Sequence, residues 1–356
     1  MADPRVQKLA EILVDYSTGV KEGDVVLITS SEAAKPLVKE VFRRVLKKGA
    51  YPRFLARWEE LNEIFLREAS EKQLGTLLDV DFEQYKSASV AINIDAPGNL
   101  KYLSNVDPER IALRQKTTRP IMDYVISGAV RWVVVNYPTS ALAQEAEMSL
   151  AEYEDFLFNA TNIDWQQMSR EQDRIKELFD KADEVRLVGK QTDLRLSVKG
   201  RMAIKCDGHE NMPDGEIFLA PVEDSAEGHI LYDFPAIYMG KEVDGVYLEF
   251  KAGKVVTARA RKNEDLLIAL LDSDDGARFI GELGIGTNWG ITRFTKDLLF
   301  DEKIGGTVHI ALGNAYPESG GTNRSAIHWD MIKDMRSDGE IYLDGRLVQK
   351  DGRFIF

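Results

Sequence analysis

The chain changes character at about its midpoint, and this change constrains the fold more than any other feature. In the first half, apolar runs of strand length alternate with amphipathic stretches of helical periodicity. Such alternation, with strands that are continuously apolar, is typical of a mostly parallel sheet covered by helices. After residue 183, short strands are separated by glycine, aspartate and asparagine turns. The sequence therefore predicts an α/β unit followed by a β-rich one.

A chain of 356 residues is also long for a single hydrophobic core. We expect an α/β N-terminal domain over 1–183 and a β-rich α+β domain that binds metal over 184–356. The predicted strands of the first domain are 24–30, 51–58, 88–94 and 129–138, and its predicted helices are 32–50, 62–77, 108–126, 139–160 and 165–182. In the second domain, seven short strands lie between 184 and 260, and one helical block covers 263–283.

Charge and cysteine content limit the partners and the compartment. The chain has 46 basic and 59 acidic residues, a net charge of −13, which argues against nucleic acid or an anionic membrane as a partner. No signal peptide and no apolar run of about 18 residues is found, so nothing is expected to cross a membrane. The single cysteine, Cys206, rules out an internal disulfide and a cysteine-type zinc site. We therefore expect a cytoplasmic protein.

Several common catalytic and nucleotide-binding motifs are missing. There is no Walker phosphate loop, no H-E-x-x-H and no G-x-S-x-G. Gly284, Gly286 and Gly290 have the wrong spacing for a dinucleotide fingerprint and follow a predicted helix. These absences weaken the interpretation of the first half as a nucleotide-binding enzyme.

Two of the four histidines stand in patterns that suit a metal ion. In the predicted strand TVHIALG, His309 shares a face with two small residues, which leaves room for an ion. His328 and Asp330 are two residues apart, so on a strand both point the same way, with Trp329 opposite. Such a pair offers one nitrogen and one oxygen to a metal. The plainer interpretation is a surface histidine beside a solvated aspartate.

Two glutamates stand at the ends of predicted elements. Glu216 precedes the apolar strand IFLAP, and Glu282 ends the predicted helical block, just before the glycine-rich GIGTN. By pattern alone, each is as well explained as a solvated carboxylate. A resemblance distinguishes them from other acids of the chain.

Most of residues 205–335 resembles the thermophilic aminopeptidase family, the metallopeptidases of the aminopeptidase T and aminopeptidase S type. The segments that carry the resemblance are NMPDGEIFLAP, EGHILYD, FKAGKVVTARARKNEDLL, DDGARFIGELGIGTN, LLFDEKIGGTVHIALG and SGGTNRSAIHWDMI. The resemblance implies a metal-dependent aminopeptidase, a homodimer, that removes N-terminal residues from peptides. The chain is shorter than other members and has a compact loop between His309 and His328.

The resemblance also implies a set of site residues. Two divalent ions, Zn, Co or Mn, would be held by Glu216, Glu282, His309, His328 and Asp330. The three carboxylates offset most of the charge of two ions, and the set contains no sulfur. Two ions close together would activate a water molecule for attack on the peptide bond.

Glu216 and Glu282 are assigned to catalysis as well as to the metals. Tyr316 would donate a hydrogen bond to the oxyanion of the tetrahedral intermediate. His209, His229 and Cys206 are given structural roles. The alternative is a catalytically silent, peptide-binding relative with the same fold.

Overall fold

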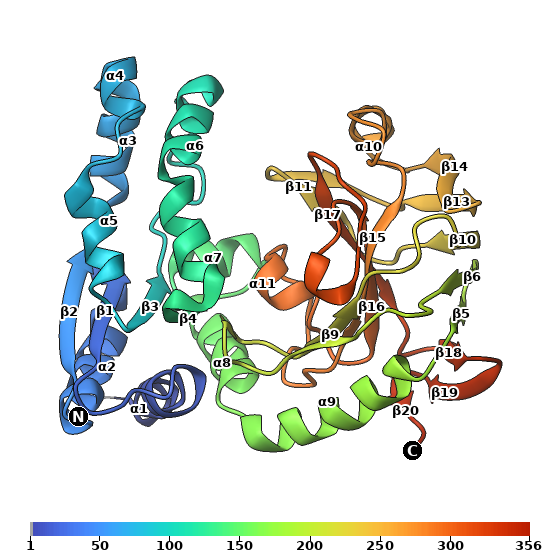
Figure 1. The fold of residues 1–356 in the computed structure, drawn as a ribbon, viewed down its shortest axis with the longest axis horizontal. Coiled ribbons are helices and arrows are strands. Elements are labelled where there is room, and N and C mark those ends of the chain that lie inside the picture. Colours follow the sequence, from blue (N-terminus) through green and yellow to red (C-terminus); the bar gives the residue numbers. More distant parts are fainter. Residues whose placement is uncertain (1–2) are drawn as a thin grey trace. The chain divides into compact units, whose positions relative to one another are not determined.

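The computed structural model describes residues 3–356 (Figure 1), which divide into two compact units. Unit 1 extends to Ile163 and includes Gly208–Pro213, whereas unit 2 comprises Asp164–Asp207 and Asp214–Phe356. The helix expected at 165–182 thus contacts mainly unit 2, and this division falls one helix before the boundary expected near 183. No helix among the described residues is long and apolar enough to cross a bilayer.

Unit 1 is the α/β part of the chain. Its strands are β1 (Val25–Ser30), β2 (Tyr51–Ala56), β3 (Val90–Asp95), β4 (Arg131–Asn136) and the short β8 (Asn211–Met212). Its helices are α1 (Pro4–Glu11), α2 (Lys35–Lys47), α3 (Glu59–Glu68), α4 (Glu71–Leu74), α5 (Asp79–Lys86), α6 (Pro108–Tyr124), α7 (Ser140–Glu145) and α8 (Leu150–Thr161), with short turns η1 (Ile12–Ser17), η2 (Glu32–Ala34) and η3 (Val125–Ala129).

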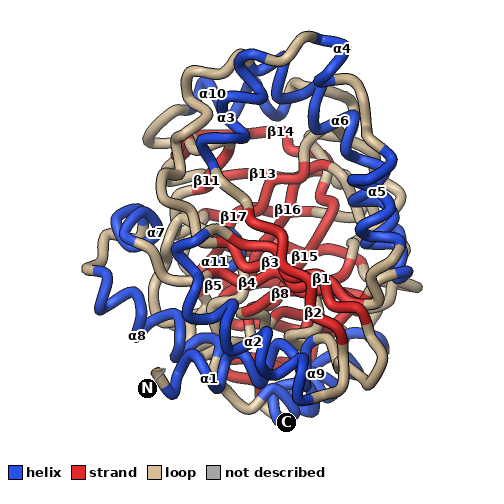
Figure 2. The backbone as a smooth tube through the Cα atoms, turned by 90° about the vertical axis from the view of Figure 1, so that its left-hand side faces the viewer, coloured by secondary structure: helices blue, strands red, loops and turns tan. Residues whose placement is uncertain are grey.

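The sheet of unit 1 has the order β2-β1-β3-β4-β8, and every pairing in it is parallel. Figure 2 shows these strands running side by side. Val26 and Ile28 of β1 pair with Val90 and Ile92 of β3, and all four are fully buried on one face of the sheet. The predicted parallel sheet is therefore present in the N-terminal region.

Unit 2 is built mainly from antiparallel strands. They are β5 (Glu184–Gly189), β6 (Thr192–Ser197), β7 (Ile204–Cys206), β9 (Glu216–Leu219), β10 (Glu227–Leu231), β11 (Ala236–Tyr238), β12 (Lys241–Val243), β13 (Tyr247–Lys251), β14 (Lys254–Arg259), β15 (Ile280–Gly286), β16 (Thr307–Gly313), β17 (His328–Asp334), β18 (Glu340–Leu343), β19 (Arg346–Lys350) and β20 (Arg353–Phe354). Its helices are α9 (Trp165–Asp180), α10 (Glu264–Leu271) and α11 (Leu298–Asp301), with the short turn η4 (Pro317–Ser319).

These strands form an eight-stranded sheet, β14-β13-β10-β6-β5-β18-β19-β20, a two-stranded ribbon, β11-β12, and a five-stranded sheet, β17-β16-β15-β9-β7. One continuous apolar core joins residues of the two larger sheets, including Leu187, Leu248, Leu283 and Ile310. Helix α9 is fixed to the five-stranded sheet by the buried amide of Gln172, which donates to the carbonyls of Cys206 and Glu216. The C-terminal region is thus β-rich and antiparallel.

One predicted element is wrong in a way that matters for function. The helical block expected over 263–283 ends at Leu271, and its last part is the buried strand β15. Polar and glycine residues at 272–276 interrupt the helix, after which all seven residues of β15 are buried. Glu282 therefore lies inside a strand at the centre of the sheet and does not end a helix.

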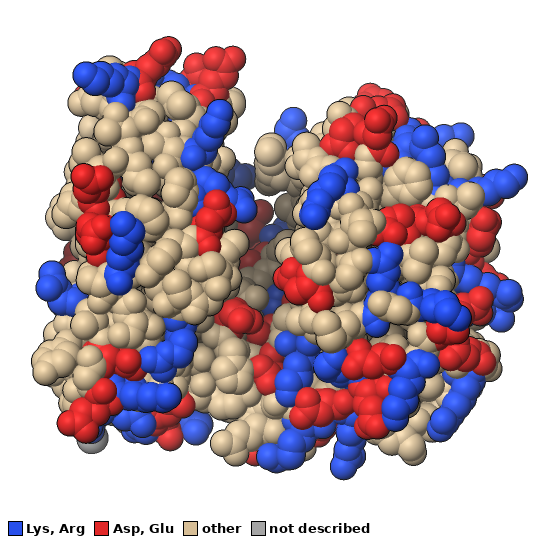
Figure 3. All heavy atoms as spheres, in the orientation of Figure 1, with Lys and Arg blue, Asp and Glu red and all other residues tan. Residues whose placement is uncertain are grey.

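The face drawn in Figure 3 carries acidic and basic side chains interspersed with each other. With a net charge of −13, this face presents no continuous positive track of the kind that a phosphate backbone requires. The buried polar residues are therefore a better guide to the ligand than the charges on this face.

Candidate metal centre

The five side chains expected to bind metal come together on one sheet of unit 2. They belong to four adjacent strands: Glu216 to β9, Glu282 to β15, His309 to β16, and His328 and Asp330 to β17. The His-x-Asp pair lies on a strand as predicted, and Trp329 between them points into the core, where its indole donates to the Ile237 carbonyl. Side chains two residues apart on a strand share a face, so β17 supplies both groups to one place.

The nitrogen and oxygen atoms of this cluster are within a few ångströms of one another. His309 Nε2 lies 3.0 Å from Glu282 Oε1 and 3.3 Å from Glu216 Oε2. His328 Nε2 lies 3.7 Å from Glu282 Oε2 and 3.5 Å from Asp330 Oδ2. Both imidazoles therefore direct Nε2 at carboxylates, with His309 at the centre and His328 at the more accessible edge.

The other ring nitrogen of each histidine is committed to the backbone. His309 Nδ1 lies 3.1 Å from the Glu302 carbonyl, and His328 Nδ1 lies 2.8 Å from the Asn314 carbonyl. A carbonyl only accepts, so in each ring Nδ1 carries the proton and donates it. Nε2 is then the atom that can bind an ion once it is deprotonated, the usual arrangement in metal sites built with histidine.

One glycine makes room for the cluster, and another lets the chain just before Glu216 pack closely against Asn288. A Cβ on Gly284 would lie 1.9 Å from His309 Nε2, so the imidazole packs directly over the glycine of the neighbouring strand. A Cβ on Gly215, which has φ of +122°, would lie 2.6 Å from the Cβ of Asn288. The glycine-rich stretch after Glu282 thus belongs to the site because of its lack of side chains.

Burial and neighbouring charges shift the pKa values of the cluster's side chains far from their ordinary values. Burial, reinforced by the charge of Glu302, raises the pKa of Glu216 to about 8. Burial likewise raises the pKa of Asp330 to about 6. For His309 burial alone acts downward, but the hydrogen bond to Glu282 and the charge of Glu216 raise its pKa to about 10. The metal-free cluster thus retains protons near neutral pH, in the positions where cations would neutralise the carboxylates.

Two buried carboxylate oxygens of this cluster lack a hydrogen bond, although Glu216 Oε2 lies 3.3 Å from His309 Nε2. Glu216 Oε2 and Asp330 Oδ1 are inaccessible to solvent and accept no hydrogen bond, although both residues are at least nine-tenths buried. A buried carboxylate oxygen without a partner is costly and rare. Glu282, His309 and Asp330 offer ligand atoms within 4.8 Å of one another. The donor set therefore fits divalent metal ions.

The structure adds residues that the sequence patterns did not identify. Glu302 also groups with Glu216 and His309 within 4.8 Å, and the ammonium of Lys303 lies 3.6 Å from Glu216 Oε1. The sequence signal was the charged DEK stretch at 301–303, which ends in a fully buried lysine directly before a buried strand. Charged residues at that position are rarely buried unless they are paired.

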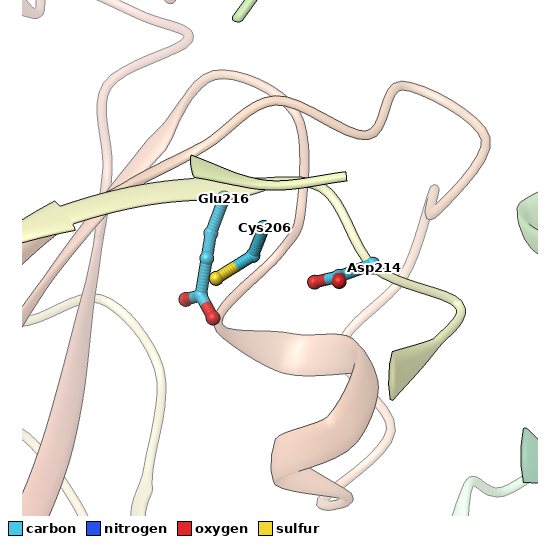
Figure 4. A group of neighbouring side chains, drawn as sticks. All are labelled: Cys206, Asp214 and Glu216. Atoms are coloured by element: carbon cyan, nitrogen blue, oxygen red, sulfur yellow. The ribbon is translucent and has the colours of Figure 1, made fainter. Parts of the chain in front are cut away.

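Behind Glu216 lie two more polar side chains. Cys206 is its cross-strand neighbour on β7, and Asp214 belongs to the loop that leads into β9 (Figure 4). Figure 4 shows the thiol directed toward the Glu216 carboxylate, with the Asp214 carboxylate facing the same space. Burial raises the pKa of the Cys206 thiol well above its ordinary value, which keeps it neutral. Cys206 is thus a neutral packing group next to a candidate ligand.

Tyr316 lies at the accessible side of the cluster. Its ring packs edge-on against His328, with 5.0 Å between centroids, and it is 40% exposed. Partial burial and the negative charge of Glu282 and Asp330 raise the pKa of its phenol. The hydroxyl therefore keeps its proton and can donate it in a hydrogen bond.

The two remaining histidines lie elsewhere. His209 belongs to unit 1 and stacks on Tyr16, with 4.8 Å between ring centroids. His229 is on β10 of the eight-stranded sheet, beside Tyr247. Neither joins the cluster of the five-stranded sheet.

Fold and site together define the class: an α/β unit followed by a β-rich unit with a buried cluster of carboxylates and imidazoles that suits metal ions. The chain matches the model of the thermophilic metalloprotease (M29) family over residues 2–354. It therefore belongs to this family of metal-dependent peptide-bond hydrolases.

Characterised relatives match the chain along its whole length. Aminopeptidase 2 of Geobacillus stearothermophilus is 27% identical over 403 residues, which cover 99% of this chain and 95% of the relative. Aminopeptidase T of Thermus thermophilus is 27% identical over 411 residues, which cover 98% of each chain. These identities are modest, but they extend over both units.

Solved structures agree with this assignment. Wild-type AmpT from Thermus thermophilus superposes with a TM-score of 0.85 at 25% identity, over 99% of both chains. A 2,5-dihydroxypyridine dioxygenase from Pseudomonas putida superposes with a TM-score of 0.60 at 16% identity, over 98% of this chain and 96% of its own. The second likeness concerns the fold alone, so the function has to be argued from the site.

Proposed function

We propose that the protein is an aminopeptidase that removes N-terminal residues from peptides with two divalent metal ions. The observation that carries this proposal is that two buried carboxylate oxygens, Glu216 Oε2 and Asp330 Oδ1, accept no hydrogen bond, in a cluster that also contains His309. Family membership and the aminopeptidase names of the relatives support the reaction. Glu216, Glu282, His309, His328 and Asp330 would hold the ions, and Glu302 is a further candidate.

Divalent ions bound by oxygen and nitrogen ligands supply a water of lowered pKa and polarise the substrate carbonyl. The mixed ligand set without sulfur suits Zn, Co or Mn. The protein's own residues would orient the metal ligands and stabilise the charge that develops on the substrate. The carbonyls of Glu302 and Asn314 fix the tautomers of the two histidines, and Tyr316 would donate to the developing oxyanion. Glu216 and Glu282 are the candidate carboxylates for proton transfer.

A cavity of about 160 Å³ in unit 2 supports binding of a residue next to the cluster. His328 and Asp330 form part of its wall, and Ile237, Tyr238 and Phe294 contribute apolar surface. We propose that it receives a side chain of the substrate, while an acidic group of the cluster binds the free α-amine. Recognition of the amine would restrict cleavage to the N-terminal residue.

We further propose that the protein is a homodimer that works in the cytoplasm. Strand β2 is the outer strand of its sheet, and Tyr51, Phe54 and Leu55 are exposed on it. An exposed apolar edge strand invites pairing with another chain, here a second copy. The single cysteine is consistent with a reducing compartment. Sedimentation of the protein and of Phe54→Lys tests the dimer, and a monomeric wild-type protein would refute it.

The deciding experiment measures metal content and hydrolysis on the same preparation. Chelation is expected to abolish release of the N-terminal residue from an aminoacyl chromogenic substrate, and Zn, Co or Mn is expected to restore it. A protein that binds two ions yet hydrolyses no aminoacyl substrate would favour the alternative, a catalytically silent peptide-binding relative. Full activity in metal-free protein would exclude the proposed mechanism.

A further inference from the structure

Two lysines are fully buried in unit 2, and only one of them lies beside the cluster. Lys303 and Lys333 are 0% and 2% exposed, respectively. Lys333 pairs with Asp233, with 2.8 Å between Nζ and Oδ2. Lys303 pairs with Glu302 and lies 3.6 Å from Glu216 Oε1. Since Lys303 is inaccessible, it cannot contact a substrate, and its role must be exercised through its neighbours.

The cluster offers two positions for a cation. The first lies among Glu282, His328 and Asp330, where His328 Nε2 is 3.7 Å from Glu282 Oε2 and 3.5 Å from Asp330 Oδ2. The second lies among Glu216, Glu302 and His309, whose ligand atoms are within 4.8 Å of one another. The ammonium of Lys303 forms ion pairs with the two carboxylates of the second position, Glu216 and Glu302. A permanent positive charge is therefore built in next to one position only.

We propose that Lys303 is a positioning residue that makes the two metal positions unequal, with tight binding at the first and weak, exchangeable binding at the second. This inference rests on the proposed two-ion function. The ammonium orders Glu216 and Glu302 in the metal-free protein, and it opposes the entry of a second cation between them. Charges this close interact strongly in a buried site, where water screens them little.

The sign of the effect follows from charge. Removing Lys303 makes the second position more negative, which attracts both a metal ion and a competing proton. A divalent ion experiences twice the electrostatic energy that a proton does in the same potential, so the metal gains more than its competitor. Neutralising Lys303 is therefore expected to tighten the second position. A side chain that served only to support the fold would, when removed, weaken metal binding.

The test is a titration of metal-free wild type and Lys303→Met with Co²⁺, in competition with a chromogenic chelator. Cobalt absorbance reports the filling of each position independently of activity. Wild type is expected to bind two ions with unequal affinity. In Lys303→Met the weaker affinity should rise by about tenfold or more, the lower range expected for losing one nearby buried charge. The tighter affinity should change much less, because the ion pairs of Lys303 are with carboxylates of the second position.

Matched variants separate charge from packing. Lys303→Arg keeps the charge and should keep the inequality, and Lys303→Gln repeats the neutralisation if the methionine variant folds poorly. Lys333→Met removes the other buried lysine and should lower the melting temperature without changing the ratio of the two affinities. If two ions bind but the weaker affinity is unchanged or reduced in both neutral variants, the role of Lys303 is refuted and the two-ion proposal stands. If wild type and variants bind one ion only, the two-ion proposal itself fails.

Discussion

The two five-stranded sheets of this protein treat their buried polar groups in opposite ways. In the parallel sheet of unit 1, the Thr29 hydroxyl donates to Asn93 Oδ1 at 2.7 Å, and the Ser30 hydroxyl donates to the Ile94 carbonyl at 2.8 Å. In the antiparallel sheet of unit 2, Glu216 Oε2 and Asp330 Oδ1 are buried without a partner. These two hydroxyls of the first sheet are satisfied within the protein, whereas these two carboxylate oxygens of the second sheet accept no hydrogen bond from it.

This difference shows how to tell structural from functional polar residues in a buried sheet. Satisfied hydroxyls and amides contribute to stability and define strand register. Buried carboxylate oxygens without hydrogen bonds lower stability, so their presence indicates a ligand whose binding offsets this loss. A crevice at the carboxyl ends of parallel strands is the usual ligand site of open α/β sheets. Here, the unsatisfied groups lie on the other sheet.

The largest effect expected is from removing the central imidazole. His309 contacts both Glu216 and Glu282, so His309→Ala disrupts both candidate metal positions. We expect both ions to be lost, and activity to fall by more than the roughly 10- to 100-fold typical of residues behind the ligands. Metal analysis and turnover on one preparation measure this.

His209→Ala and His229→Ala are the matched controls for that experiment. They remove imidazoles from unit 1 and from the eight-stranded sheet, and both should retain most of the metal and activity. If His229→Ala lost the metal while His309→Ala kept it, the assignment of the site to the five-stranded sheet would be wrong.

The next effect separates catalysis from metal binding within unit 2. Tyr316→Phe removes one donor that would act mainly in the transition state, while ring packing on His328 is kept. We expect kcat to fall by about a hundred- to a thousandfold with little change in KM and with metal content unchanged. Near-normal turnover would make Tyr316 a packing residue, and loss of metal would make it a ligand.

How much of this organisation the sequence predicts differs between the two units. Strands β1 and β4 are predicted to within two residues, because largely apolar runs bounded by turn residues leave few alternatives. In unit 2, the strand that carries Glu282 was predicted as helix. Its sequence IGELGIG mixes apolar residues with three glycines, and the glycines exist to accommodate His309 and other neighbours far along the chain. Local periodicity cannot report such a tertiary requirement.

The candidate site shows the same limit. The five expected residues do meet on one sheet, but the patterns alone also allowed solvated side chains, and the set was proposed from the family resemblance. Glu302 and Lys303 were missed because no spacing rule links them to Glu216, which lies more than eighty residues earlier in the chain. Their relation depends on which strands are neighbours, and local sequence patterns do not specify that order.

A smaller effect concerns pH and the stability of the metal-free protein. The pKa values of Glu216 and His309 are raised to about 8 and about 10 in the folded state. The folded protein therefore keeps protons that the unfolded chain loses, and stability must fall as pH rises through this range. We expect the melting temperature of chelated protein to be lower at pH 9 than at pH 6.

Metal should reverse this trend. Ligands must be deprotonated to bind ions, so the rise in melting temperature on adding Zn²⁺ should grow with pH. In His309→Ala, which lacks the central ligand, that rise should disappear at every pH. A chelated wild-type protein that became more stable toward pH 9 would contradict the proposed burial of protonated ligands.

The smallest effect tests the contrast between the sheets with two near-isosteric substitutions. Thr29→Val removes a hydroxyl whose hydrogen bond is made within the protein, so it should lower the free energy of unfolding by about 1 kcal/mol and leave metal content unchanged.

Asp330→Asn removes the charge of a carboxylate whose pKa burial raises to about 6. At pH 8 that carboxylate is ionised and poorly solvated in metal-free protein, so the amide should raise the free energy of unfolding, on the order of 1 kcal/mol, while metal binding is lost. Urea unfolding of chelated proteins at pH 8 measures both changes. Opposite signs are expected because the first substitution removes a hydrogen bond, whereas the second removes a buried charge whose burial outweighs its attraction to His328. If Asp330→Asn destabilised the chelated protein as Thr29→Val does, the aspartate would be a structural residue, and the case for a metal ion beside it would be lost.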